Sequence, residues 1–296
     1  MKTILVMTDF SRAAKNAAQT ALNIAEHFGA ALLLLHSYQL SQIMFAEPLK
    51  MDYQAIEEKA AISLEKEKDR LLKLMKTRRQ AIRIRTINTI APIAEVLYDI
   101  QQGEKVILAV MGRHKAHKSN FLFANHIHVA MRNSDCPLLI LSSGTFLLHR
   151  CRINFASDLN EKDIALLESI DKIRMAFKAS ISIGSVMEST GLIADFGEED
   201  RLASFQHALR KDKFSDIPFH LLTSNAIASE IERIFPPSED NLLLLVNRNH
   251  GLLYEIFHSS HCRAIIKKHR GAILVLPELW KPGCRPQPGT GALKTI

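Results

Sequence analysis

The chain has 296 residues, of which 47% are hydrophobic and 23% are charged, and 38 Lys and Arg against 31 Asp and Glu give a net charge of +7. This is the composition of an ordinary globular protein, and its length favours two domains over a single core. The apolar runs, such as residues 30–35 and 242–246, are far shorter than the ~20 residues of a transmembrane helix, so no membrane span is predicted. Because the first residues enter a strand-like run without a signal-peptide cleavage pattern, we expect a cytoplasmic protein.

The cysteines and the net charge limit which disulfides, metal sites and binding partners can be expected. Four cysteines stand far apart without a C-x-x-C pair, so neither a disulfide framework nor a zinc site is predicted. The positive charge would attract anions such as nucleotides or nucleic acid, or it serves solubility alone. Aromatic residues are only 6% and no basic stripe with interleaved aromatics is present, so nucleic-acid binding is not favoured.

Strand-like and helix-like segments alternate through the first half. The apolar run 4–8 precedes Ser11, which can cap a helix with alanines at helical spacing, and Gly29 lies just beyond its end. Further strands are predicted at 31–36, 82–86, 106–111 and 138–141, and further helices at 54–77, 92–102 and 125–133. Strands that alternate with helices predict parallel pairing through right-handed crossovers.

The pattern restarts in the second half, after a linker at residues 142–150. The segment RINFASD at 152–158 matches KTILVMTD at 2–9, so Asp9 and Asp158 take equivalent positions. The helical periodicity that follows in each half is also similar. This indicates that one structural unit occurs twice.

The last third of each half gives stronger evidence for a repeat. Residues 112–141 and 247–276 align without a gap at an offset of 135, and their closing apolar strands coincide. The chain therefore consists of two copies of one α/β unit. The predicted domains are residues 1–145 and 151–277, followed by a Pro- and Gly-rich tail at 278–296.

Several short motifs in this order resemble the universal stress protein family. They are a strand ending in TDFS at 8–11, a second strand ending in LLLLHS, a strand end VMG at Gly112, and a last helix followed by CPLLIL. The resemblance implies for each domain a five-stranded parallel sheet in the order 3-2-1-4-5 with helices on both faces. It also implies that the two domains form a pseudo-dimer, usually through their last strands, and leaves open whether the chain forms a homodimer in turn.

Nucleotide-binding members of this family carry G-x-x-G-x9-G-[ST] after the fourth strand. Glycines there let backbone N–H groups close on phosphate at a helix N-terminus. The corresponding first-half residues are Gly112, Lys115, Asn125 and His126. The corresponding second-half residues are Asn247, His250, Ser260 and His261. The strand-loop-helix arrangement is kept. Of the three glycine positions of the motif in each half, six in all, only Gly112 is still a glycine.

Other residues bear on whether a nucleotide still binds. Arg113 and Lys115 make the first loop basic, and the loop and its helix contain no acid, so side-chain charge can still hold an anion. The resemblance places Asp9 where the family's aspartate meets adenine, with Asp158 as its equivalent in the second half. The alternative interpretation is that both carboxylates accept hydrogen bonds from nearby loop or helix N–H groups.

Metal and enzyme sites are not favoured by the motifs. Eight of the thirteen histidines lie in the two matching segments, but no carboxylate or thiolate in the first completes a ligand set, so they are interpreted as solvated loop residues and no metal site is predicted. The sequence lacks the G-x-x-x-x-G-K-[ST], G-x-G-x-x-G and G-x-S-x-G patterns. We therefore expect a protein that is not an enzyme.

The functional prediction is a non-catalytic stress-response or regulatory module with lost or weakened nucleotide binding. It would need no cofactor and would act through protein contacts or an unidentified ligand. The alternative is a stress sensor, with weak ATP hydrolysis at most, that binds ATP with Mg in the first domain only.

Overall fold

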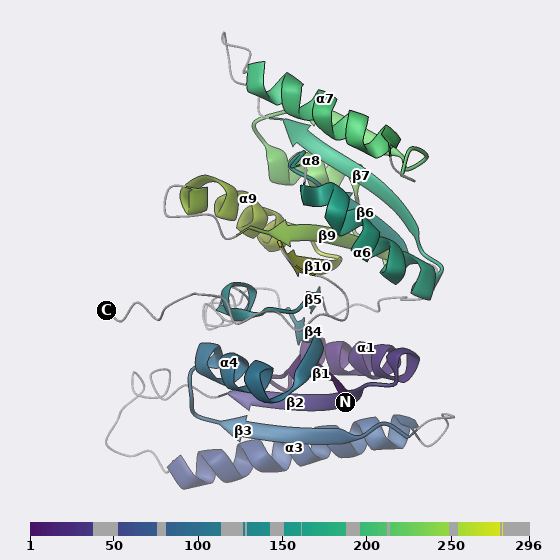
Figure 1. Cartoon of the computed structure of the whole chain (residues 1–296). Coiled ribbons are helices and arrows are strands. Elements are labelled where there is room, and N and C mark those ends of the chain that lie inside the picture. Colours follow the sequence, from purple (N-terminus) through teal and green to yellow (C-terminus); the bar gives the residue numbers. More distant parts are fainter. Residues whose placement is uncertain are drawn as a thin grey trace.

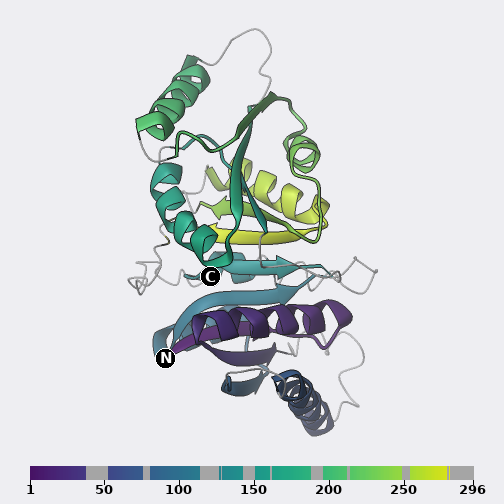
Figure 2. The same cartoon turned by 90° about the vertical axis from the view of Figure 1, so that its right-hand side faces the viewer.

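The computed structural model describes residues 1–37, 53–75, 81–113, 127, 129–142, 151–160, 162–187, 196–211, 214–248, 254–278 and 280. These residues form one twisted sheet with helices on both faces (Figures 1 and 2). The strands are β1 (Lys2–Met7), β2 (Ala31–Ser37), β3 (Ile84–Thr89), β4 (Lys105–Gly112), β5 (Leu138–Leu141), β6 (Arg152–Ala156), β7 (Ser180–Met187), β8 (Phe219–Thr223), β9 (Asn241–Asn247) and β10 (Ala272–Pro277). The helices are α1 (Arg12–Phe28), α3 (Tyr53–Met75), α4 (Ile93–Gly103), α6 (Lys162–Phe177), α7 (Phe196–Lys211), α8 (Ile227–Ile234) and α9 (Tyr254–Lys268). Residues 129–133 are helical as well.

The strand order confirms the predicted fold class. The ten strands run β3-β2-β1-β4-β5-β10-β9-β6-β7-β8, so each half has the order 3-2-1-4-5. Strand neighbours within each half are parallel. The halves meet where β5 pairs with β10 in the antiparallel sense, with Ile140 opposite Ile273. One continuous sheet therefore crosses the boundary between the two repeats.

The strands are apolar on both sides because both faces of the sheet are covered. On β1, Ile4 and Val6 belong to one core cluster, and Leu5 and Met7 belong to the other. Helices α1, α3, α6 and α7 contribute to the first cluster, and α4, α8, α9 and the helical residues 129–133 contribute to the second. Both clusters contain residues of both halves, so the core also continues across the boundary.

Helix α1 begins and ends as the sequence predicted. The Ser11 hydroxyl accepts a hydrogen bond from the Ala14 N–H at 3.1 Å, and Gly29 ends the helix at φ 59°. At this end the ring of His27 lies 4.9 Å from that of Phe177 on α6, which joins the helix layers of the two halves.

Among the described residues, no helix is both long and apolar enough to cross a membrane.

Candidate functional site

The two candidate aspartates lie in matching loops at the carboxyl ends of β1 and β6. Asp9 is followed by Phe10 at φ 63°, and Asp158 is followed by Leu159 at φ 61°. The N–H of each of these left-handed residues donates to the hydroxyl two positions earlier, at 3.0 Å in both loops. Left-handed backbone is costly for a residue with a Cβ, so its presence in both copies shows that the loop geometry is shared and over-determined.

In the first half, Asp9 belongs to a small polar cluster. Its Oδ1 accepts a hydrogen bond from the Ser11 N–H at 3.2 Å, in agreement with the alternative interpretation of this carboxylate. The His36 ring, at the end of β2, lies 4.5 Å from the Phe10 ring, and its Nδ1 donates to the Thr8 carbonyl at 2.8 Å. Burial lowers the pKa of His36, although the Thr8 carbonyl and Asp9 act in the opposite direction. Burial thus favours the neutral form of this ring.

Gly112 is required by close packing of β4 against the start of α1. A Cβ on Gly112 would lie 2.6 Å from the Ala13 carbonyl oxygen, and nearer still to the Ala13 carbonyl carbon and the Ala14 nitrogen. These are backbone atoms, which cannot rotate away as a side chain can. The one glycine kept from the family motif therefore has a structural role whether or not a phosphate binds beside it.

We expect Gly112→Ala to lower the free energy of unfolding by about 1–3 kcal/mol, because strand or helix must shift to admit the methyl group. Urea denaturation followed by circular dichroism measures this loss. Gly103→Ala is the matched control, since a Cβ at Gly103 meets nothing within 4 Å. Equal losses in the two variants would contradict the packing explanation.

Arg113 directs its side chain across the boundary between the halves. Its guanidinium donates to the carbonyl oxygens of Ile266 and His269 at the end of α9, and to the Ser142 hydroxyl at 3.0 Å. A cation there is favoured by the partial negative charge of the helix C-terminus. Burial lowers the pKa of Arg113 to about 10, with Arg270 acting in the same direction, so the side chain keeps its charge at pH 7. Arg113, which the sequence placed in the basic loop, is thus bonded to the end of α9 in the second half.

Asn247 forms a hydrogen bond across the same boundary in the opposite direction, from the second half to the first. Its Nδ2 donates to the Met131 carbonyl at 2.8 Å, so a second-half residue reaches the helical residues of the first half. Met131 and Ile266 are equivalent under the offset of 135 that relates the repeats. The hydrogen bonds that Arg113 and Asn247 form across the boundary, to Ile266 and Met131, therefore end at the carbonyl oxygens of equivalent residues. We call these two crossings, together with the β5–β10 pairing, the joint.

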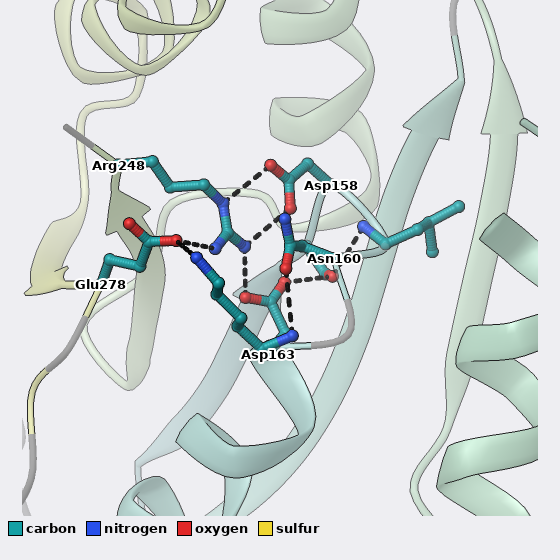
Figure 3. A network of polar contacts seen from close by, with 8 residues as sticks. Asp158, Asn160, Asp163, Arg248 and Glu278 are labelled. Carbon is teal, nitrogen blue, oxygen red and sulfur yellow. Dashed lines mark hydrogen bonds and ion pairs between the residues drawn. The ribbon is translucent and has the colours of Figure 1, made fainter. Parts of the chain in front are cut away.

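In the second half an ion network occupies the carboxyl ends of β6 and β9 (Figure 3). Arg248 donates to both carboxylate oxygens of Asp158, at 2.9 and 2.8 Å, and the same guanidinium also bonds Asp163. Glu278, after β10, lies 3.6 Å from Arg248. The side chains of Arg248 and Asp163 are 4% and 0% exposed. A guanidinium therefore covers the aspartate that is equivalent to Asp9.

The protonation equilibria reflect this burial. Burial raises the pKa of Asp163 to about 6, even though Arg248 and a hydrogen bond of 2.6 Å from the Ser157 hydroxyl favour the ionised form. Burial alone would lower the pKa of Arg248, but Asp163 and Asp158 raise it above its ordinary value. Arg248 is thus permanently charged, and at pH 7 Asp163 is mostly ionised beside it.

The charge of the network does not suit a phosphate. Lys162 donates to Glu278 at 2.8 Å and adds a second cation to Arg248. Three carboxylates, those of Asp158, Asp163 and Glu278, face these two cations, so the fully ionised network has a net charge of −1. An anion entering here would meet three carboxylates and a guanidinium whose Nε and Nη2 are already bonded to Asp158 and Asp163, while its Nη1 has no hydrogen-bond partner among the described residues.

The network residues other than Asp158 were missed by the sequence reasoning. One signal was available, because Arg113 and Arg248 are equivalent in the gap-free alignment and a repeated arginine after a strand marks a structural position. Lys115, Asn125, His126 and His250 lie outside the described residues. Ser260 and His261 lie within α9.

Comparison with known proteins agrees with this fold. Residues 1–142 match the universal stress protein family. A solved structure from Pseudomonas aeruginosa, described as a universal stress protein, is 16% identical, with 93% of this chain and 92% of that chain covered and a TM-score of 0.59. A universal stress protein from Archaeoglobus fulgidus is also 16% identical, with 93% and 96% covered and a TM-score of 0.59. No curated protein matches the sequence significantly. Identity this low shows the fold alone.

Proposed function

Because residues 1–142 match the universal stress protein family, we propose that the chain is a non-catalytic regulatory module of the stress response that acts through protein contacts. In this proposal its second nucleotide site is closed by its own side chains, and its first site is weakened. The observation that carries the proposal is the ion pairing of Arg248 with Asp158 and Asp163.

A nucleotide would have to open this network to reach the second site. Leaving the buried carboxylate of Asp163 without its partner would cost about 3–5 kcal/mol, which lowers affinity by roughly two to three and a half orders of magnitude. The phosphates of ATP would also approach carboxylates that outnumber the local cations. Both effects favour an empty second site at cellular nucleotide concentrations.

The first site has lost one of its candidate contacts to a structural role. The Arg113 guanidinium is bonded to carbonyls of the second half. Gly112 is explained by its packing on α1, so its presence is not evidence for a retained phosphate site. These contacts support weakened binding in the first domain. Protein contacts, or a ligand other than a nucleotide, are then the routes by which the module would act.

The test is a calorimetric titration of the nucleotide-stripped protein with Mg-ATP at low and moderate salt, since charge-driven binding weakens with salt while a shaped site persists. The proposal predicts no saturable heat up to millimolar ATP. Micromolar binding at one equivalent that Asp9→Ala abolishes and Asp158→Ala keeps would establish the alternative, an ATP sensor in the first domain. Binding that Asp158→Ala abolishes would overturn the closed second site.

A further inference from the structure

His269 has a buried imidazole for which the described part of the chain offers no hydrogen-bond partner. It follows α9, its residue is 1% exposed, and neither ring nitrogen is bonded to any described residue. The turn is folded closely around the ring, because a Cβ on Gly271 would lie 2.8 Å from Nε2 and 3.2 Å from Pro237. A buried polar group that is left unpaired costs stability, so the ring destabilises the folded state even when it is neutral.

The same turn belongs to the joint. The His269 carbonyl accepts a hydrogen bond from Arg113 of the first half, so a permanent positive charge lies beside the ring. Arg270 adds a second positive charge near Arg113. The nearby acid, Glu232 on α8, lies 3.9 Å from the Lys268 ammonium group. The electrostatic surroundings therefore oppose an imidazolium ion.

We propose that protonation of His269 opens the joint and makes the association of the two domains acid-sensitive. An imidazolium carries two N–H donors, and in the closed turn beside Arg113 neither ring nitrogen has a partner among the residues that the structure describes. The ring must leave its site to be solvated, and the carbonyls that hold Arg113 move with the turn. This inference goes beyond the proposed function and does not depend on nucleotide binding.

The direction and size of the effect follow from the two states of the ring. Burial, with a smaller contribution from Arg113, lowers the pKa of His269 from 6.5 to about 4 in the closed joint. An open joint returns the ring to its ordinary pKa, so the open state binds the proton more tightly. The joint has its full stability above pH 6.5 and loses it as the pH falls towards 4. Between pH 7 and pH 5 the opening constant should rise roughly 20-fold.

Native-state hydrogen exchange on the full chain tests this inference. Protection of the β5 and β10 amides, corrected for intrinsic exchange, should fall roughly 20-fold from pH 7 to pH 5, while the β2 amides change much less. His269→Phe keeps a buried ring that cannot titrate, and should lose the pH dependence. His220→Phe, on the exposed strand β8, should keep it. Because other groups such as Asp163 also titrate in this pH range, the comparison is made between variants at equal pH.

Two results would overturn the proposal. One is wild-type protection that does not change between the two pH values, and the other is an equal loss in His269→Phe. If that variant fails to fold, an NMR titration of the wild-type His269 ring decides instead. The proposal expects a pKa below 5 in the closed joint, and an ordinary value near 6.5 would contradict it.

Discussion

Replacing Arg248 with methionine should lower the free energy of unfolding by about 3–5 kcal/mol, because it leaves the buried carboxylate of Asp163 without its counter-charge. Methionine keeps much of the aliphatic volume of the side chain, so the loss reports mainly on charge. Asp163 is fully buried, and Asp158 loses both of its bonds to the guanidinium. Urea denaturation at pH 7.5 measures the change.

Two further variants separate this effect from a general loss of surface charge. Arg152→Met removes an ion pair with Asp240 whose partners are 57% and 42% exposed, and should cost less than about 1 kcal/mol. Adding Asp163→Asn to Arg248→Met should restore part of the stability, since the uncompensated charge is then gone. Equal costs for Arg248→Met and Arg152→Met, or no rescue by Asp163→Asn, would show that the network is not a coupled buried unit.

Replacing Arg113 with methionine should weaken the joint by about 2–4 kcal/mol. Hydrogen bonds to charged groups contribute about 1.5–3 kcal/mol each, and the guanidinium makes three whose contributions are not additive. The Ile266 and His269 carbonyls also lose the cation at the end of α9. The loss should appear both in urea denaturation and as faster exchange of the β5 and β10 amides, with less change at the distant strand β3.

Asn247→Ala is the counterpart of this change on the other side of the joint. It removes one neutral hydrogen bond to Met131 and should cost about 1 kcal/mol. The two variants together therefore compare the stability contributed by a charged contact with that contributed by a neutral one. A larger cost for Asn247→Ala than for Arg113→Met would contradict the expectation that the charged Arg113 contributes more to the joint than Asn247 does.

Much of the fold could be predicted because its signals are local in sequence. Alternating apolar runs and helical periodicities predicted two α/β repeats, and the strand order confirms the fold class. The Ser11 cap and the left-handed Gly29 were predicted from residue type and position, since each of these conformations favours few residues. Such features depend on neighbours within a few residues and are readable without tertiary structure.

The candidate site was less predictable because its side chains depend on distant partners. Arg113 and Arg248 share one register of the repeat, yet the first crosses the joint and the second turns into its own domain. Asp163 looks in the sequence like an ordinary acid in the first turn of a helix, and only its distant partner in β9's loop shows it to be part of an ion network. Sequence periodicity carries no information on such pairings.

A crystal structure of the full chain grown with saturating Mg-ATP tests the central claim most directly. The account predicts that Arg248 stays bonded to Asp158 and Asp163 and that no nucleotide lies at the carboxyl ends of β6 and β9. Nucleotide density at that place, with the Arg248 side chain displaced from both carboxylates, would contradict it.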